Sequence, residues 1–265
     1  MGHSLFVELK NRGALALRKL KLFHQLVAFF ATKSSDPKPS VFLGRTGPST
    51  LLCRPPPTHQ FWVVSLRLCF LCAAISYLVG SVLYPGGSYH NAHAAGFDHW
   101  HNYLCDLWAE HPHGHVHNAA RPWGIATVFF LSAALTPLSL IIWRLTARTS
   151  PRARAVSLLL MTGTPSGCLV FTPFHDLAIE VGFIPTSVGY LLSLFALGHA
   201  GYLRLAWLGL WPLGAAVLNF ALWITGAAPF FTPLVQKFAL LGLLTWALLA
   251  SAVRNQANGH SDVKA

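Results

Sequence analysis

The chain has 265 residues, of which 54% are hydrophobic and only 10% are charged. Because soluble domains carry about 25% charged residues, this composition excludes an ordinary soluble protein and requires a lipid environment. The formal net charge of +11 does not indicate nucleic-acid binding, since the basic residues lie in the first 54 residues and in short segments between apolar runs.

Residues 1–60 differ from the rest of the chain and predict a basic N-terminal leader. In the segment 13–32, leucines alternate with basic residues, a pattern typical of an amphipathic helix on an anionic membrane surface. Residues 34–60 are rich in Pro, Ser, Thr and Gly, which favours a flexible connection. The alternative left open is that the leader belongs to an over-extended reading frame.

Six apolar runs follow, each near the roughly 20 residues that a helix needs to cross a bilayer. Helix is the expected structure, because open strands would leave backbone groups unpaired in lipid. We therefore predict an all-α integral membrane bundle of six transmembrane helices over residues 61–253. The runs are 61–84, 123–143, 155–172, 181–203, 205–224 and 230–253. Prolines are expected to kink or locally break four of these helices, at Pro137, Pro165, Pro185 and Pro212.

The basic residues between the runs predict the orientation. Arginines crowd the connection 144–154, whereas the first, third and fifth connections carry only Arg121. By the positive-inside rule, both termini, including the tail 254–265, are expected in the cytoplasm and the loop 85–121 outside the inner membrane. Lys237 lies about two turns into the last run from its outer end, where a charge is costly and raises the question of a function.

The loop 85–121 concentrates the ionisable chemistry of the chain, with eight of its 14 histidines. In an extended chain, the four histidines of the tract 111–117 would point the same way at a spacing of about 7 Å. Such a tract chelates divalent metals readily. We interpret it as an exposed, flexible tract with adventitious metal affinity, and look for a specific site elsewhere.

A second polar segment, 173–180, is predicted on the same outer face as the histidine-rich loop. If it is helical, Asp176 and Glu180 share one helix face and His175 lies beside it. Imidazole and carboxylate together can ligate zinc or a similar divalent metal, or serve as general acid and base. We therefore predict that the two segments meet in a shared site. Its candidate metal ligands are His175, Asp176, Asp98, His99, His101 and Asp106.

Three motifs between Tyr84 and Ile125 carry a resemblance to a known family: YPGG, GF-x-HWHNYLCDLW and NAARPWGI. This pattern resembles bacterial membrane proteins of the domain of unknown function 998 type, with Cys105 where a serine is more usual. Pro173 followed by His-Asp near the end of the third run is also similar. The resemblance covers residues 61–253 and implies a six-helix membrane bundle, without an established reaction.

These features favour a multi-pass inner-membrane protein that binds a metal or another polar ligand at its outer mouth. One open alternative is a metal-dependent hydrolase acting on a lipid-like substrate. The chain has a distant similarity to ceramidase-like hydrolases, which bind zinc through His and Asp, but residues 230–253 contain no histidine for their HxxxH motif. The other is a small transporter or sensor with Lys237 and Asp176 as charge partners. The lipid bilayer is the partner expected; nucleic acid is not.

Overall fold

The computed structural model describes residues 59–114, 117–147 and 153–253, and in these segments every regular element is a helix. The chain divides into two units, Met1–Thr58 and His59–Ala265. The predicted leader at 1–60 lies outside the described residues, except for the last two, which begin the first described helix. The predicted tail at 254–265 also lies outside them.

Five helices of the described segments are long and apolar enough to cross a membrane. They fall on five of the six predicted runs, so an all-helical chain with several potential membrane-spanning helices is confirmed. The five are α2 (His59–Leu83), α3 and α4 together (Arg121–Ala133 and Leu135–Thr146), α7 (His175–His199), α8 (Leu203–Thr225) and α9 (Thr232–Ala252).

The remaining predicted run, 155–172, folds as two short helices, α5 (Ala153–Met161) and α6 (Gly163–Leu169). Pro165 explains the break. It has no N–H to donate to the carbonyl of Met161 four residues earlier, and its ring would clash with that carbonyl. The first helix accordingly ends at Met161.

Pro137 produces the same effect in the second run, where α3 ends at Ala133, four residues before the proline. The other two prolines, Pro185 and Pro212, lie inside the continuous helices α7 and α8. Local breaking is therefore confirmed at two of the four predicted prolines.

Threonine hydroxyls join the two broken helices beside their breaks. The Thr164 hydroxyl donates to the backbone carbonyl of Ser132 over 3.0 Å and lies 3.2 Å from the hydroxyl of Thr136. Such hydroxyls replace helix-backbone partners where a proline has removed one. The bonds hold α6 against α3 and α4 at mid-height of the bundle.

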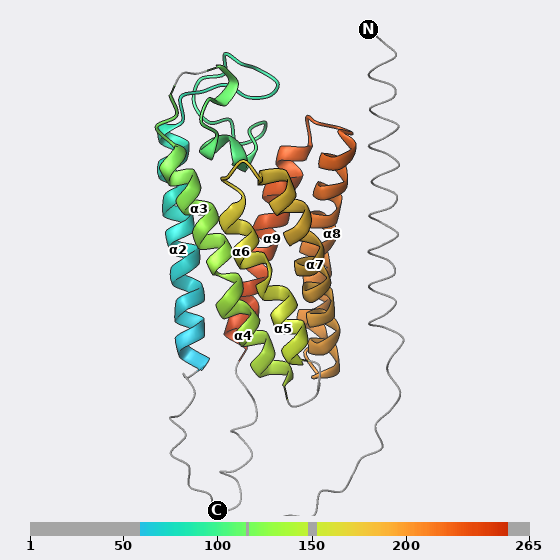
Figure 1. Cartoon of the computed structure of the whole chain (residues 1–265). Coiled ribbons are helices and arrows are strands. Elements are labelled where there is room, and N and C mark those ends of the chain that lie inside the picture. Colours follow the sequence, from blue (N-terminus) through green and yellow to red (C-terminus); the bar gives the residue numbers. More distant parts are fainter. Residues whose placement is uncertain (1–58, 115–116, 148–152, 254–265) are drawn as a thin grey trace, which may run out of the picture. The chain divides into compact units, whose positions relative to one another are not determined.

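Figure 1 shows the helices of the second unit running side by side, with α2 next to α3 and α8 next to α9. The segment between α2 and α3 folds over one end of these helices. The α6–α7 and α8–α9 connections lie at this same end, which we call the cap end. The last turn of α4, the first turn of α5 and the α7–α8 connection lie at the opposite end.

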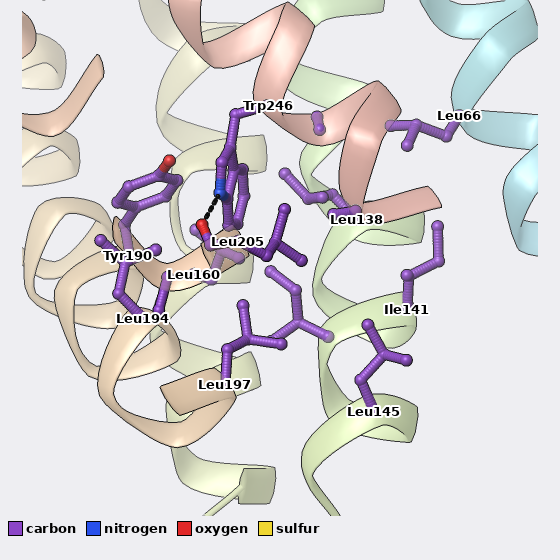
Figure 2. Close-up of a cluster of buried hydrophobic side chains, with 14 of the residues drawn as sticks. Leu66, Leu138, Ile141, Leu145, Leu160, Tyr190, Leu194, Leu197, Leu205 and Trp246 are labelled. Atoms are coloured by element: carbon purple, nitrogen blue, oxygen red, sulfur yellow. Dashed lines mark hydrogen bonds between the residues drawn. The ribbon is translucent and has the colours of Figure 1, made fainter. Parts of the chain in front are cut away.

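The main core occupies the part of the bundle distant from the cap end and centres on Trp246 (Figure 2). The Trp246 side chain is 2% exposed, and its indole N–H donates to the carbonyl of Leu205 over 2.9 Å. The Tyr190 ring packs against it at 4.7 Å between ring centroids. Because lipid tails are as apolar as leucine, such helix packing is stabilised by close contact and interhelical hydrogen bonds.

Replacing Trp246 by alanine is expected to lower the free energy of unfolding by about 3 kcal/mol, because it leaves a cavity between α7, α8 and α9 and removes the bond to Leu205. Reversible unfolding in mixed detergent micelles measures the change. Leu249→Ala is the matched control, since Leu249 lies one turn away on the same helix but is 45% exposed. Equal losses for the two variants would contradict this account of the core.

Candidate functional site

Residues 84–120 form a compact structure that we call the cap, described except for 115–116. It contains two 3₁₀ helices, η1 (Leu104–Trp108) and η2 (Pro112–Gly114), and an isolated antiparallel bridge between Gly86 and Ala95. Leu107 is fully buried in it, and Gly124 of α3 permits this packing. A Cβ at Gly124 would lie 2.6 Å from the Leu107 backbone.

The hub of the cap is Asn102, whose side chain is fully buried. Its amide nitrogen donates to the Gly87 carbonyl over 2.8 Å and to Asp106 Oδ2 over 2.9 Å, and its amide oxygen accepts the backbone N–H of Asp98 at 2.8 Å. The Tyr84 hydroxyl lies 3.3 Å from the same nitrogen. A neutral amide thus pairs two backbone groups of the irregular cap, the Gly87 carbonyl and the Asp98 N–H.

Asp106 continues this network. It accepts the backbone N–H of Tyr103 over 2.8 Å, and His113 Nε2 lies 3.6 Å from its carboxylate. His113 is half-buried with φ 47°, and Gly87, with φ 83°, makes room for it: a Cβ there would lie 2.7 Å from His113 Cβ. Within the predicted flexible tract 111–117, His113 is therefore packed into the cap.

Burial in the cap also changes the chemistry of Cys105. Its enclosure, with the nearby Asp106 carboxylate as a second cause, raises the pKa of the Cys105 thiol to about 12. Burial likewise raises the pKa of the Tyr84 phenol. Both groups therefore stay neutral at physiological pH, and the thiol of Cys105, although partly exposed, is a weak nucleophile.

Helix α9 attaches the cap to the membrane helices. The Lys237 ammonium donates to the carbonyl of Asn102 and, over 3.3 Å, to that of Pro233. Gln236 Oε1 accepts the backbone N–H of Leu104 over 2.9 Å. Lys237 is also 5.8 Å from the centroid of the Phe97 ring. These contacts answer the question raised by a lysine within the last run: its charge is directed out of the apolar bundle into the cap.

The predicted ligands of the first loop form local pairs. Asp98 Oδ2 lies 2.6 Å from His101 Nδ1, and Asp98 Oδ1 accepts the backbone N–H of Trp100. Partial burial alone would raise the pKa of Asp98, but these hydrogen bonds outweigh it and lower the pKa overall. His99 is bonded through Nδ1 to the Tyr77 hydroxyl at 2.8 Å.

The second predicted segment begins α7 and lies at the cap end. His175 Nδ1 is 2.9 Å from Asp176 Oδ1, and the His175 ring packs near Trp108 of the cap, at 6.3 Å between centroids. The two segments therefore approach one another, as expected for segments predicted on the same face of the membrane. Asp176 is bonded to its neighbour His175, and Lys237 is bonded to the cap. These two residues therefore do not form the charge pair considered for a transporter.

Across the described residues, no group of three or more His, Cys, Asp or Glu side chains is placed to hold a metal ion. The six predicted ligands His175, Asp176, Asp98, His99, His101 and Asp106 are instead divided among the separate pairs given above. The metal site at the outer mouth therefore stays a prediction. A second candidate site lies in a different part of the bundle.

This second candidate site is a cavity of about 370 Å³ that lies beneath the cap. It was not predicted from the sequence. Leu104 of η1 and Gln236 line its cap end, while Leu160, Tyr190 and Leu243 line it near mid-height. Along α7 the wall runs from Ala178 to Tyr190, which is about 18 Å of helix. Its walls are leucine, valine, alanine and phenylalanine, with few polar groups.

Two of those polar groups are hydroxyls on α7, Thr186 and Tyr190. Neither hydroxyl has a hydrogen-bond partner among the described residues, and both oxygen atoms are buried. The signal that could have located the cavity is the run of small residues around Pro165. Gly163 and Gly167 line the cavity where the helix is broken.

Comparison of the chain with protein-family models, with curated proteins and with solved structures found no match.

Replacing Lys237 by methionine is expected to loosen the cap, because it removes the ammonium that holds the Asn102 carbonyl. The reactivity of the Cys105 thiol measures this loosening in a variant in which the other four cysteines, Cys53, Cys69, Cys72 and Cys168, are replaced by alanine. The parent should react slowly with iodoacetamide at pH 8, since a thiol with a pKa of about 12 is almost wholly protonated there. Lys237→Met should raise the rate, because exposing the thiol to water lowers its pKa by more than loss of the nearby Lys237 charge raises it.

The control for this experiment is Arg121→Met, which removes another cation of the cap end whose partner, Glu110, is exposed. Its labelling rate should match that of the parent. Equal rates in the parent and in Lys237→Met would show that Lys237 does not hold the cap.

Proposed function

We propose that this chain is a multi-pass membrane protein that binds a small lipid-like molecule in the cavity beneath the cap. The observation that carries the proposal is the cavity itself. Its volume of about 370 Å³ and its largely apolar wall with a few polar groups are those of small-molecule sites, which in helix bundles lie between helices.

The wall chemistry supports an apolar occupant. A cavity lined by leucine and phenylalanine binds water poorly, because each water needs two to four polar partners. Such a cavity is better filled by a hydrocarbon chain, and the surrounding bilayer supplies these. The occupant is therefore expected to enter from lipid, between helices.

The position of the cap supports a binding site that is closed at one end. Leu104 and Gln236 both line the cavity, and the bond between them fixes η1 over it. Lys237, the neighbour of Gln236, holds the carbonyl of Asn102, two residues before Leu104. Under this proposal the cap separates the cavity from the aqueous phase.

Binding is favoured over hydrolysis by the groups on the cavity wall. The described residues that line it supply hydroxyls and one side-chain amide, Gln236, but no imidazole or carboxylate. Those are the groups that serve most often as general acid and base. We therefore place the hydrolase alternative second.

The cavity is tested with an Ala216→Phe variant, because Ala216 lines it from α8 and a phenyl ring there would occupy part of its volume. A photoreactive, alkyne-tagged long-chain ketone is added to membrane vesicles, and crosslinked peptides are mapped by mass spectrometry. Crosslinks to α7 and α9 should be saturable and should fall at least fivefold in the variant.

Val217→Phe provides the matched control, since Val217 is the next residue of α8 and is 41% exposed. It adds similar bulk on a face outside the cavity wall, so its crosslinking should equal that of the parent. Unsaturable labelling that is the same in all three proteins would mean contact with bulk lipid only, and would refute the proposal.

We also propose that the cap end faces the outside of an inner membrane and that both termini are cytoplasmic. The supporting observation is the charge distribution, because Arg144 and Arg154 lie at the end opposite the cap. The resemblance to membrane proteins of the domain of unknown function 998 type is part of the same proposal, and agrees with a helical membrane bundle.

Orientation is tested with single cysteines in a cysteine-free chain. Asn91→Cys in the cap should react with an impermeant maleimide added to intact cells, whereas Ala147→Cys at the other end should react only after permeabilisation. Both positions are exposed, so accessibility depends on sidedness alone. The reverse labelling pattern would overturn the orientation.

A further inference from the structure

We infer that the ligand of the cavity is a neutral amphiphile whose hydrogen-bond-accepting oxygen, of the ketone, ester or quinone carbonyl class, is held by Tyr190 with Thr186 beside it. This inference rests on the proposed function and names the chemistry of the bound molecule.

The first observation is that Thr186 departs from the pattern of other helical threonines and serines, and that the buried Tyr190 hydroxyl is unpaired as well. Serine and threonine hydroxyls in apolar helices bond the carbonyl four residues earlier. Thr127, Thr146, Ser193, Thr225 and Thr245 all do so here. Thr186 and Tyr190 have no hydrogen-bond partner among the described residues.

The direction of Thr186 explains its lack of a bond within α7. A Cβ built on Gly163 would lie 2.8 Å from Thr186 Oγ1, so this hydroxyl lies over the start of α6. Gly163 sits at the break caused by Pro165. The broken helix and its glycine thus leave space for a polar group of α7 beside the cavity.

Tyr190 lies on the same face of α7, one turn beyond Thr186. Long side chains on a helix lean toward its N-terminus, so the Tyr190 hydroxyl is carried back toward the turn of Thr186. Trp246 packs against the Tyr190 ring at 4.7 Å and limits its motion. In Figure 2 the hydroxyl points away from the packed side chains of Leu160 and Leu194.

An unpaired hydroxyl in an apolar interior is unfavourable, and the bilayer offers it no water. Both residues line the cavity, and their hydroxyls can donate to an oxygen that enters it once a small movement of the side chains brings the buried oxygens to its surface. The cavity has no cationic side chain among its described lining residues, and the nearby Lys237 is engaged by the cap. A carboxylate or phosphate would therefore be left without charge compensation, whereas a carbonyl needs only a donor.

The placement of the donors also orients the ligand. Tyr190 and Thr186 are on the part of the α7 wall distant from the cap, while the polar side chains toward Ile179 and Leu104, Ser166 and Gln236, are already bonded to backbone groups. The carbonyl is accordingly held near mid-height of the bundle, and an apolar chain extends along the cavity toward the cap.

The experiment uses three photoreactive, alkyne-tagged probes of equal chain length in vesicles containing the full-length protein: a methyl ketone, a fatty acid at pH 7.5, and a hydrocarbon. In the parent, half-saturation by the ketone should need about fivefold less probe than by the hydrocarbon, the effect of about one buried hydrogen bond. Tyr190→Phe should abolish this fivefold preference and leave hydrocarbon capture unchanged.

Two further measurements separate ligand binding from a structural role. Tyr190→Phe should not destabilise the ligand-free protein, because it removes an unpaired hydroxyl and keeps the ring against Trp246. Tyr202→Phe, a hydroxyl deletion at the α7–α8 connection, should retain the preference for the ketone. Thr186→Val should reduce that preference with less effect than Tyr190→Phe.

Equal capture of ketone and hydrocarbon by the parent, or a preference for the fatty acid, would overturn this inference and leave the proposed function in place. A ketone preference that survives Tyr190→Phe would also overturn it. If instead Ala216→Phe captures every probe as well as the parent does, the cavity binds none of them and the proposed function fails too.

Discussion

The attachment of the cap to α9 is the contact on which both the cap and the cavity depend. Gln236 and Lys237, adjacent residues of α9, bind the backbone of Leu104 and Asn102. The Asn102 side chain in turn holds the irregular backbone of the cap, and Leu104 lines the cavity below. These two residues thereby provide hydrogen-bond partners for backbone groups of the cap and hold η1 over the apolar cavity.

The second constraint is the pair of proline breaks. Pro137 and Pro165 each end a helix four residues earlier, and threonine hydroxyls join the broken helices. The second break adjoins the cavity, because Gly163, Ser166 and Gly167 of α6 line it. The space that we assign to a ligand therefore lies beside a broken helix.

The sequence predicted the helical membrane bundle well, because long apolar runs in lipid have few alternatives to helix. It also predicted the meeting of His175 with the first loop, here through Trp108. It could not predict that Asp98 and His101, or His175 and Asp176, bond within pairs, since side-chain partners depend on local backbone geometry. The cavity was not predicted either, because apolar residues that line a space have the same pattern as residues that fill one, and only the small residues around Pro165 distinguish it.

The distance along the chain between the cap and its attachment has a consequence for biosynthesis. Lys237 follows Asn102 by 135 residues. At synthesis rates of about 5–20 residues per second, the cap emerges roughly 10 s before its anchor has been made. During that interval the buried asparagine network lacks its support from α9, so the nascent chain acquires its finished surface only after the final helix has entered the membrane.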